Sequence, residues 1–219
     1  MPNWCECDLY IYGPDCVTVA DSLKATKLQE GEDELSLFDF NTGIPMPEIL
    51  EGSNAGSEET AALELIQIED GEWAHDILTL AGAPKLSEAG KEAMTALQTR
   101  KKELLERFPK LPKYAARVRQ MVMETGHSSW YTWANANWGV KWNAARVRRV
   151  DRKTSVKVMF ETAWGPPVKA IEALAKKYPK TRFLLKYYEC GMAFQGRVVY
   201  SGGEEVESSQ GTYSGNRGG

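Results

Sequence analysis

Apolar and polar residues alternate with period two in several short stretches of the chain. In the stretch from Trp4 to Tyr12, every second residue from Cys5 to Ile11 is small or apolar, and these residues would share one face. The residues between them are polar or aromatic. Such alternation is typical of a strand with one buried face. The same pattern predicts strands at 155–162, 182–188, 193–200 and, over a shorter stretch, 35–40. Glu189-Cys190-Gly191 supplies the turn of a predicted hairpin.

Helical spacing of apolar residues fills most of the remaining chain. Ser57 and Ser87 stand where N-cap residues are expected, and Gly126 stands where a helix should end. The predicted helices run over 17–25, 57–69, 72–80, 87–108, 113–125 and 168–178. The block 53–127 is therefore predicted to be a helical insertion. The Gly-, Ser- and Glu-rich residues 201–219 predict a flexible C-terminal tail.

The order of these elements predicts the fold class. A strand and a helix open the chain, and strand, helix, strand and strand follow the insertion. This is the order of a ferredoxin-like split βαβ antiparallel sheet, an α+β fold. Residues 1–52 and 128–200 would then form one ferredoxin-like α/β domain that the helical insertion interrupts.

The segment 130–143 concentrates tryptophan. It holds four of the seven tryptophans of the chain, and each indole brings a large buriable surface and an N–H that needs a partner. Trp138 and Trp142 are four residues apart and would share one face of a helix or of a strand. Trp130 and Trp133 have the spacing of a second pair on a helix. Two interpretations stay open: the rings form a core, or they line a pocket.

Polar residues interleaved with these rings favour a binding site. Burying an amide without a partner costs about 1–3 kcal/mol, so some of the asparagines should face water or a ligand. A basic strand follows, with Arg146 and Arg148 on a charged face. Aromatic rings beside Arg and Lys suit stacked bases and phosphates, and Trp, Tyr and Arg also dominate protein–protein hot spots. The candidate ligand- or partner-binding residues are Trp130, Trp133, Asn135, Asn137, Trp138, Lys141, Trp142, Arg146 and Arg148.

The net charge of −3 conceals a division of charge along the chain. Residues 28–84 contain fourteen Asp and Glu and no Lys or Arg, whereas residues 85–219 contain twenty-five Lys and Arg against twelve Asp and Glu. In one interpretation the acidic segment packs beside the basic one and each screens the other. In the other, the two segments offer faces to a polyanion or to a basic partner.

Catalytic, metal and membrane functions have little support in the sequence. The two histidines, His75 and His127, belong to no catalytic motif, and no P-loop, GxSxG, GxGxxG or HExxH occurs. We therefore expect no enzyme and no cofactor. The four cysteines include no CxxC pair, so no metal site is predicted. No apolar run of 18 residues and no signal peptide occurs, which predicts a reduced cytoplasmic protein without a membrane partner.

Motifs spaced through nearly the whole chain point to a known family. They are Met1-Pro2-Asn3-Trp4-Cys5 with Leu9 and Gly13, Ile44-Pro45-Met46-Pro47, Asn137-Trp138-Gly139-Val140-Lys141-Trp142-Asn143, Thr162-Ala163-Trp164-Gly165-Pro166-Pro167, Tyr187-Tyr188-Glu189 and Gly196-Arg197-Val198-Val199-Tyr200. In these motifs the chain resembles the YubB-type, Api-like group of uncharacterised proteins, which bacteriophages and conjugative plasmids carry. It departs from the family pattern at Cys7, where Asn or Ser is usual, and at Val140, where Thr is usual.

The resemblance implies a ferredoxin-like domain and an origin in a mobile genetic element, and it implies no established activity, cofactor or catalytic residue. Proteins of that origin are often accessory factors that act on host defence or physiology in the bacterial cytoplasm. We therefore expect a non-catalytic binding protein whose partner is a host protein or a nucleotide-type small molecule. One alternative is a single-stranded nucleic-acid-binding module built on the Trp- and Arg-rich segment. The second alternative is an enzyme of unknown reaction.

Overall fold

A computed structural model of the protein describes residues 3–28, 33–80 and 87–215. The chain divides into two compact units, which we call the sheet unit (Met1–Met46 with Trp133–Gly219) and the helical unit (Pro47–Thr132). The division falls within helix α5 (Trp130–Asn137). The helical unit therefore takes in a few residues on either side of the predicted 53–127 insertion.

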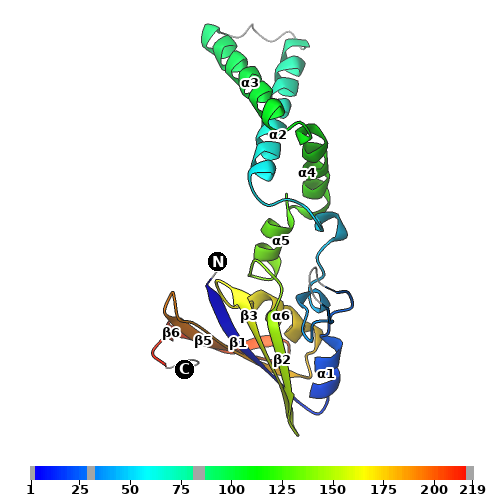
Figure 1. Ribbon diagram of the computed structural model, residues 1–219, viewed down its shortest axis with the longest axis vertical. Coiled ribbons are helices and arrows are strands. Elements are labelled where there is room, and N and C mark those ends of the chain that lie inside the picture. Colours follow the sequence, from blue (N-terminus) through cyan, green and yellow to red (C-terminus); the bar gives the residue numbers. More distant parts are fainter. Residues whose placement is uncertain (1–2, 29–32, 81–86, 216–219) are drawn as a thin grey trace. The chain divides into compact units, whose positions relative to one another are not determined.

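The described part of the sheet unit holds one six-stranded antiparallel sheet in the order β2-β3-β1-β4-β5-β6 (Figure 1). Its strands are β1 (Trp4–Tyr12), β2 (Ala145–Asp151), β3 (Ser155–Ala163), β4 (Arg182–Glu189), β5 (Phe194–Ser201) and β6 (Glu204–Thr212). With α1 (Cys16–Ser22) after β1 and α6 (Val168–Lys177) after β3, the first four strands have the split βαβ topology of a ferredoxin-like fold. This confirms the predicted α+β class.

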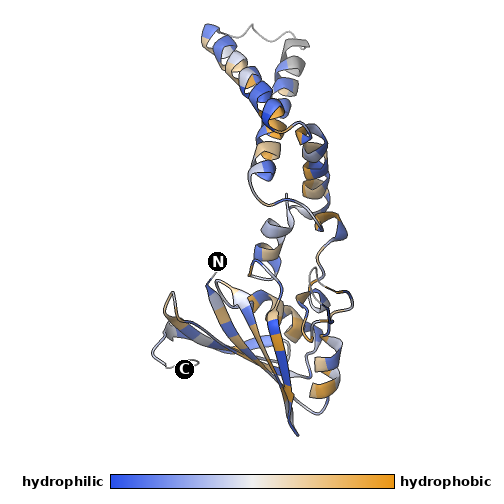
Figure 2. Cartoon of the chain, in the orientation of Figure 1, coloured by the Kyte–Doolittle hydropathy of each residue, from blue (hydrophilic) through white to orange (hydrophobic). Residues whose placement is uncertain are grey.

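Period-two alternation places one face of the sheet in the core. Leu9 of β1 is fully buried and lies between Val158 of β3 and Leu185 of β4. Helix α1 contacts β1 and β3, and α6 contacts β4, β5 and β6. In α6 the buried Ile171 and Leu174 face the sheet, and the lysines of its last turn are exposed. The strands are accordingly banded with hydrophobic and hydrophilic residues (Figure 2).

The predicted strand at 35–40 is wrong. Phe38 and Phe40 are both buried, and their rings meet the ring of Phe160 edge-on at centroid distances of 4.9 and 6.1 Å. Phe40 begins the 3-10 helix η1 (Phe40–Thr42). The two aromatic rings thus cover the core side of β3. Packing on Phe160 buries their apolar surface, so this segment needs no strand pairing.

The predicted flexible tail over 201–219 is wrong for residues 204–212, which form β6; its last residues, 216–219, lie outside the described residues. This strand pairs with β5 from Ser201↔Glu204 to Phe194↔Thr212, and Gly202 and Gly203, both with positive φ, make the tight turn between the two strands. All β6 side chains are exposed. The strand is therefore held mainly by backbone hydrogen bonds. Such bonds need no buried side chains, so the sequence shows no apolar alternation here.

The helical unit contains α2 (Ser57–Leu80), α3 (Glu88–Arg107), α4 (Leu111–Thr125) and the 3-10 helix η2 (Glu48–Leu50). The separate helix predicted at 72–80 is wrong because α2 continues through Gly71. Two predicted helix ends are confirmed: the Gly90 N–H donates to Ser87 Oγ at 3.2 Å, and Gly126 adopts φ 76°. None of the helices in the described ranges is long and apolar enough to cross a membrane.

Acidic side chains of α2 pair with basic side chains of α3 and α4. The pairs join Arg100 to Glu64, Lys101 to Glu72, and Arg119 to Glu69 and Asp70. The buried Glu59 accepts a hydrogen bond from Ser128 Oγ at 2.6 Å. Four of the fourteen acids of the acidic segment are thus paired with cations of the same unit, which supports the screening interpretation for α2.

Candidate functional site

The second face of the sheet carries polar side chains in rows that cross the strands. Strand pairing aligns residues of all six strands in one row, which contains Arg148, Met159, Asp8, Lys186, Arg197 and Ser209. The neighbouring row contains Glu161, Glu6, Tyr188, Gln195 and Gly211. Because side chains on a strand alternate between faces, both rows lie opposite the buried face. We call this surface the open face.

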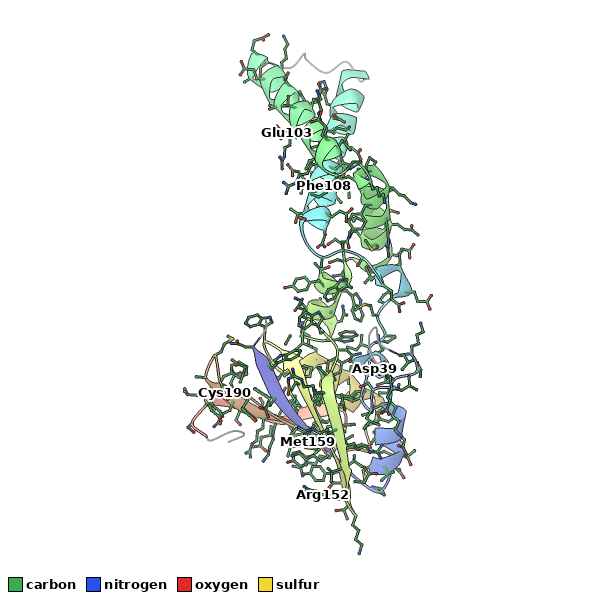
Figure 3. All side chains as sticks on the ribbon, viewed as in Figure 1. Asp39, Glu103, Phe108, Arg152, Met159 and Cys190 are labelled. Carbon is green, nitrogen blue, oxygen red and sulfur yellow. The ribbon has the colours of Figure 1, made fainter. Side chains whose placement is uncertain are left out.

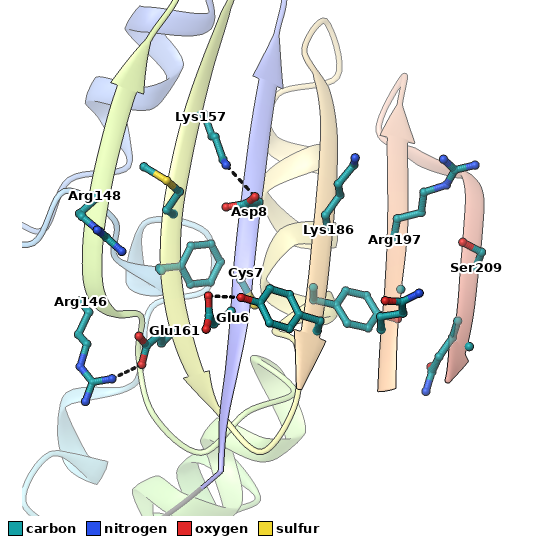
Figure 4. Close-up of a pocket in the computed structure, with 18 residues that line it drawn as sticks. Glu6, Cys7, Asp8, Arg146, Arg148, Lys157, Glu161, Lys186, Arg197 and Ser209 are labelled. Carbon is teal, nitrogen blue, oxygen red and sulfur yellow. Dashed lines mark hydrogen bonds and ion pairs between the residues drawn. The ribbon is translucent and has the colours of Figure 1, made fainter. Parts of the chain in front are cut away.

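A concave site of about 720 Å³ lies on the open face (Figure 4). Among the described residues that line it, five are cationic and three are acidic, a balance of +2. The cations are Arg146, Arg148, Lys157, Lys186 and Arg197, and the acids are Glu6, Asp8 and Glu161. A volume of this size is in the range that small-molecule sites occupy.

Each of the three described acids that line the site is already engaged by a neighbouring side chain. Lys157 Nζ lies 2.7 Å from Asp8 Oδ2, Arg146 pairs with Glu161, and Tyr188 donates its hydroxyl to Glu6 (Figure 4). Burial opposes the charge of Lys157, but the hydrogen bond and charge of Asp8 outweigh it, so the pKa of Lys157 lies above its usual value. Burial, followed by the hydrogen bond to Glu6, raises the pKa of Tyr188.

Two of the five described cations that line the site differ from the other three. Arg148 and Lys186 are exposed, and neither forms an ion pair with any residue in the described ranges. They lie in one row, on opposite sides of β3 and β1. Arg197 continues the row on β5 and pairs with Glu207 of β6. The positive balance of the site is therefore concentrated at Arg148 and Lys186.

A buried acceptor and a buried thiol complete the site. The Oε1 atom of Gln195 is buried and has no hydrogen-bond partner among the described residues, so it can accept a bond from a ligand donor. Burial raises the pKa of the Cys7 thiol well above its usual range. Cys7 therefore stays protonated, and its pairing with Thr162 Oγ1 at 3.6 Å is structural.

Aromatic rings stand at the β1 N-terminal end of the open face. Trp4 shares a face of β1 with Glu6 and Asp8 by alternation, and the centroid of its ring lies 6.1 Å from that of Trp142. The guanidinium of Arg146 lies 5.2 Å from the centre of the Trp4 ring, and Lys141 Nζ lies 4.1 Å from the centre of the Trp142 ring. These distances are typical of cation–π contacts.

The structure separates the predicted site residues into several groups. Trp133 and Trp138 are buried in the core of the sheet unit, and Trp138 packs on Trp133 and Phe40. The predicted pairing of Trp138 with Trp142 is wrong, because residues 138–143 form neither helix nor strand and turn the two rings apart. Trp142 is instead 36% exposed.

The remaining predicted residues lie on three different surfaces. Trp130 belongs to the helical unit, where its ring contacts Tyr131 edge-on. Asn135 is exposed on α5, and Asn137 donates its side-chain amide to the Trp133 carbonyl at 3.0 Å. The site residues that lie together on or beside the open face are Lys141, Trp142, Arg146 and Arg148.

Sequence reasoning missed the strand residues that make most of the site. Glu6, Asp8, Lys157 and Lys186 occupy the outward positions of strands whose inward positions were recognised. Outward polar residues are ordinary on any half-buried strand, so only the pairing register shows that these four converge. No group of three His, Cys, Asp or Glu side chains within 3–28, 33–80 and 87–215 is arranged to hold a metal ion.

Comparison with known proteins finds one family model that matches part of the chain. No curated protein matches the chain. Among solved structures, a crystal structure of the protein api92 from Yersinia pseudotuberculosis is 14% identical, with 99% of each chain covered and a TM-score of 0.43. Residues 137–216, which span β2 to β6 and α6, match a family model described as the ferredoxin-like domain in Api92-like protein. This part of the chain is thus similar to the ferredoxin-like domain of Api92-like proteins.

Proposed function

We propose that the protein is a non-catalytic binding protein whose open face takes up a nucleotide-type anionic ligand. The observation that carries this proposal is the row with Arg148 and Lys186, two exposed cations that form no ion pair with any residue that the structure describes. They lie in a concave site whose described lining has a balance of +2. A ligand with about two negative charges, such as a phosphomonoester, would match that balance. Arg is well suited to hold phosphate because its planar guanidinium donates two parallel hydrogen bonds.

The groups around these cations favour a ligand that also has a ring and polar edges. Trp142 exposes part of its ring beside Lys141, and an exposed indole next to a cation can stack on a base. Gln195 offers a buried acceptor. A nucleotide supplies phosphate, a planar ring and hydrogen-bond donors together, whereas a simple sugar phosphate lacks the ring.

The state of the acidic groups favours binding over catalysis. Glu6, Asp8 and Glu161 each accept a bond from Tyr188, Lys157 or Arg146. A general base needs an unengaged lone pair directed at the substrate, and in each of these carboxylates one oxygen is already committed to a neighbouring side chain. The sequence resemblance to phage and plasmid proteins further suggests that the ligand or its carrier belongs to a bacterial host, and that binding serves an accessory role in host defence or physiology.

A host protein is the second candidate partner. Trp142 and Trp164 are 36% and 49% exposed, and exposed tryptophans are common anchors of protein interfaces. This candidate requires contacts made by the aromatic residues, whereas the nucleotide candidate requires the cations of the open face. The two can therefore be distinguished by mutation.

The test measures binding of nucleoside mono-, di- and triphosphates by isothermal titration calorimetry. The double variant Arg148→Gln/Lys186→Gln removes both unpaired cations. The matched control Arg152→Gln/Lys180→Gln removes one Arg and one Lys that are exposed outside the site, Arg152 lying in the turn between β2 and β3 (Figure 3). We expect the first variant to lose at least tenfold in affinity and the control to bind as the parent does. Equal losses in both variants, or no binding of any nucleotide by the parent, would refute the proposal.

A further inference from the structure

We infer that the open face holds several consecutive nucleotides of a single-stranded nucleic acid, running over β2 and β3 from the Trp4–Trp142 pair to the Tyr10–Tyr12 pair. This inference rests on the proposed function and extends it from the cation row along the strand direction. Three observations carry it: two separated aromatic pairs, a succession of cations between them, and a strained residue that directs one of these cations.

The two aromatic pairs stand far apart on one face of β1. Trp4, with Trp142 against it, is near the start of the strand, and Tyr10 is six residues further along. The rings of Tyr10 and Tyr12 are stacked, with centroids 6.2 Å apart and planes inclined by 9°. At ~3.3 Å per residue the two pairs are about 20 Å apart. One mononucleotide cannot stack on both.

Cations follow one another between these two pairs. Arg146 lies near the level of Glu6, Arg148 lies at the level of Asp8, and Lys157 lies at the level of Tyr10. Successive levels are two residues apart, or about 6.6 Å along a strand. This repeat is about twice the ~3.4 Å rise of a stacked single strand, so each level can meet the phosphate of every second nucleotide. Lys157 Nζ also lies 5.3 Å from the centre of the Tyr10 ring, which places a cation at the second aromatic pair.

A strained backbone position directs the first of these cations. Arg146 has φ 51° and lies where the pairing of β2 with β3 shifts between Ala145 and Arg148. A residue other than glycine in this left-handed region costs of order 1 kcal/mol or more, and such strain gathers at functional sites. The bulge turns the guanidinium of Arg146 toward the Trp4 ring.

Stacked single strands rise ~3.4 Å per nucleotide, so about six nucleotides bridge the two aromatic pairs. The probes are 5′-fluorescein-labelled oligouridylates and oligothymidylates of one to twelve nucleotides, with affinity measured by fluorescence anisotropy. We expect affinity to rise at least a hundredfold from one to about six nucleotides and then to level off. For three phosphate contacts, the logarithm of the binding constant should fall with the logarithm of salt concentration with a slope of about −2.

The aromatic variants separate stacking from charge. Trp142→Leu and Tyr10→Leu should each lower hexamer affinity about tenfold and move the plateau to shorter chains. Trp142→Phe and Tyr10→Phe keep a ring and should retain most of the hexamer affinity. They control for a loss of affinity that misfolding of the leucine variants would cause. Tyr131→Leu, at an exposed tyrosine of the helical unit, is the matched control.

The possible outcomes distinguish the inference from the proposed function. Affinity that rises with length and falls in the two leucine variants supports the inference. Affinity that is flat from one to twelve nucleotides overturns the inference and leaves the proposed function standing. Failure of the parent protein to bind either nucleotides or oligonucleotides overturns both.

Discussion

Trp138 and Trp142 stand four residues apart in the sequence and should differ sharply in their contribution to stability. Trp138 is 4% exposed, its ring meets those of Trp133 and Phe40 at 5.3 and 5.7 Å, and its indole N–H donates to the Ile44 carbonyl at 2.9 Å. Replacing a buried Trp by Ala typically costs about 3–5 kcal/mol because transfer energy is lost and a cavity remains. We expect Trp138→Ala to lower the unfolding free energy of the sheet unit by that amount.

Trp142→Ala is the matched comparison. This ring is 36% exposed and makes one tilted aromatic contact and one cation–π contact. Such contacts contribute about 0.5–1.5 and 0.5–1 kcal/mol, so the expected loss is about 1–2 kcal/mol. A third variant, Trp138→Phe, keeps a ring but leaves the Ile44 carbonyl without its donor. Because this bond is only partly buried, the added loss should lie near the lower end of the about 1–3 kcal/mol that an unpaired buried acceptor costs.

The assay must report on the sheet unit alone, because a chain of two units need not unfold in one step. Hydrogen exchange followed by mass spectrometry does so when it is read from peptides of β1 and β3. A loss of 3–5 kcal/mol corresponds to exchange roughly a hundred- to several-thousand-fold faster, and Trp142→Ala should accelerate it at most about thirtyfold. Equal acceleration by the two alanine variants would refute the assignment of Trp138 to the core and Trp142 to the surface.

Two further predictions concern the same sheet. In Gly196→Ala the new methyl group would lie 2.6 Å from the Ser209 carbonyl oxygen and against the Tyr187 hydroxyl, so we expect a loss of about 1–3 kcal/mol in urea denaturation. Gly211→Ala has no atom within 4 Å to meet and should be neutral; equal effects would contradict this packing. Burial raises the pKa values of Tyr188 and Tyr200, so the folded state holds these protons more tightly than the unfolded chain. Their contribution to stability is full below pH ~10 and is lost as the pH rises further; urea midpoints measured from pH 8 to 11.5 should fall less steeply in Tyr200→Phe than in the parent, and identical slopes would count against it.

Hydrophobic alternation was sufficient to predict the strands that carry the core. The predicted bounds of β1 agree with the structure at both ends, and the inward positions Val156, Val158 and Phe160 of β3 are buried as expected. Alternation could not reveal β6, whose one large apolar side chain, Val206, is 58% exposed. An edge strand that buries no apolar side chain has no hydrophobic period of its own.

The tryptophan segment shows a different limit. Its composition correctly indicated large buriable rings, but spacing alone cannot distinguish a regular element from a turn. After α5 ends at Asn137, Gly139 adopts φ 82°, and the chain leaves the helical path that would have kept Trp138 and Trp142 on one face. Trp138 consequently packs in the core, and Trp142 reaches Trp4, which is distant in the sequence.

The internal ion pairs of the open face bear on how tightly any polyanion can bind. Arg146 and Lys157 already have carboxylate partners in Glu161 and Asp8, so a phosphate must share each cation with an acid a few ångströms away. Only Arg148 and Lys186 meet a phosphate without that competition among the described cations of the site. Charge alone would therefore give weak binding that salt readily reverses. Under the proposed function, useful affinity then has to come from stacking on the aromatic pairs at the two ends, and this would select ligands with bases over polyphosphate or sulfated chains of equal charge.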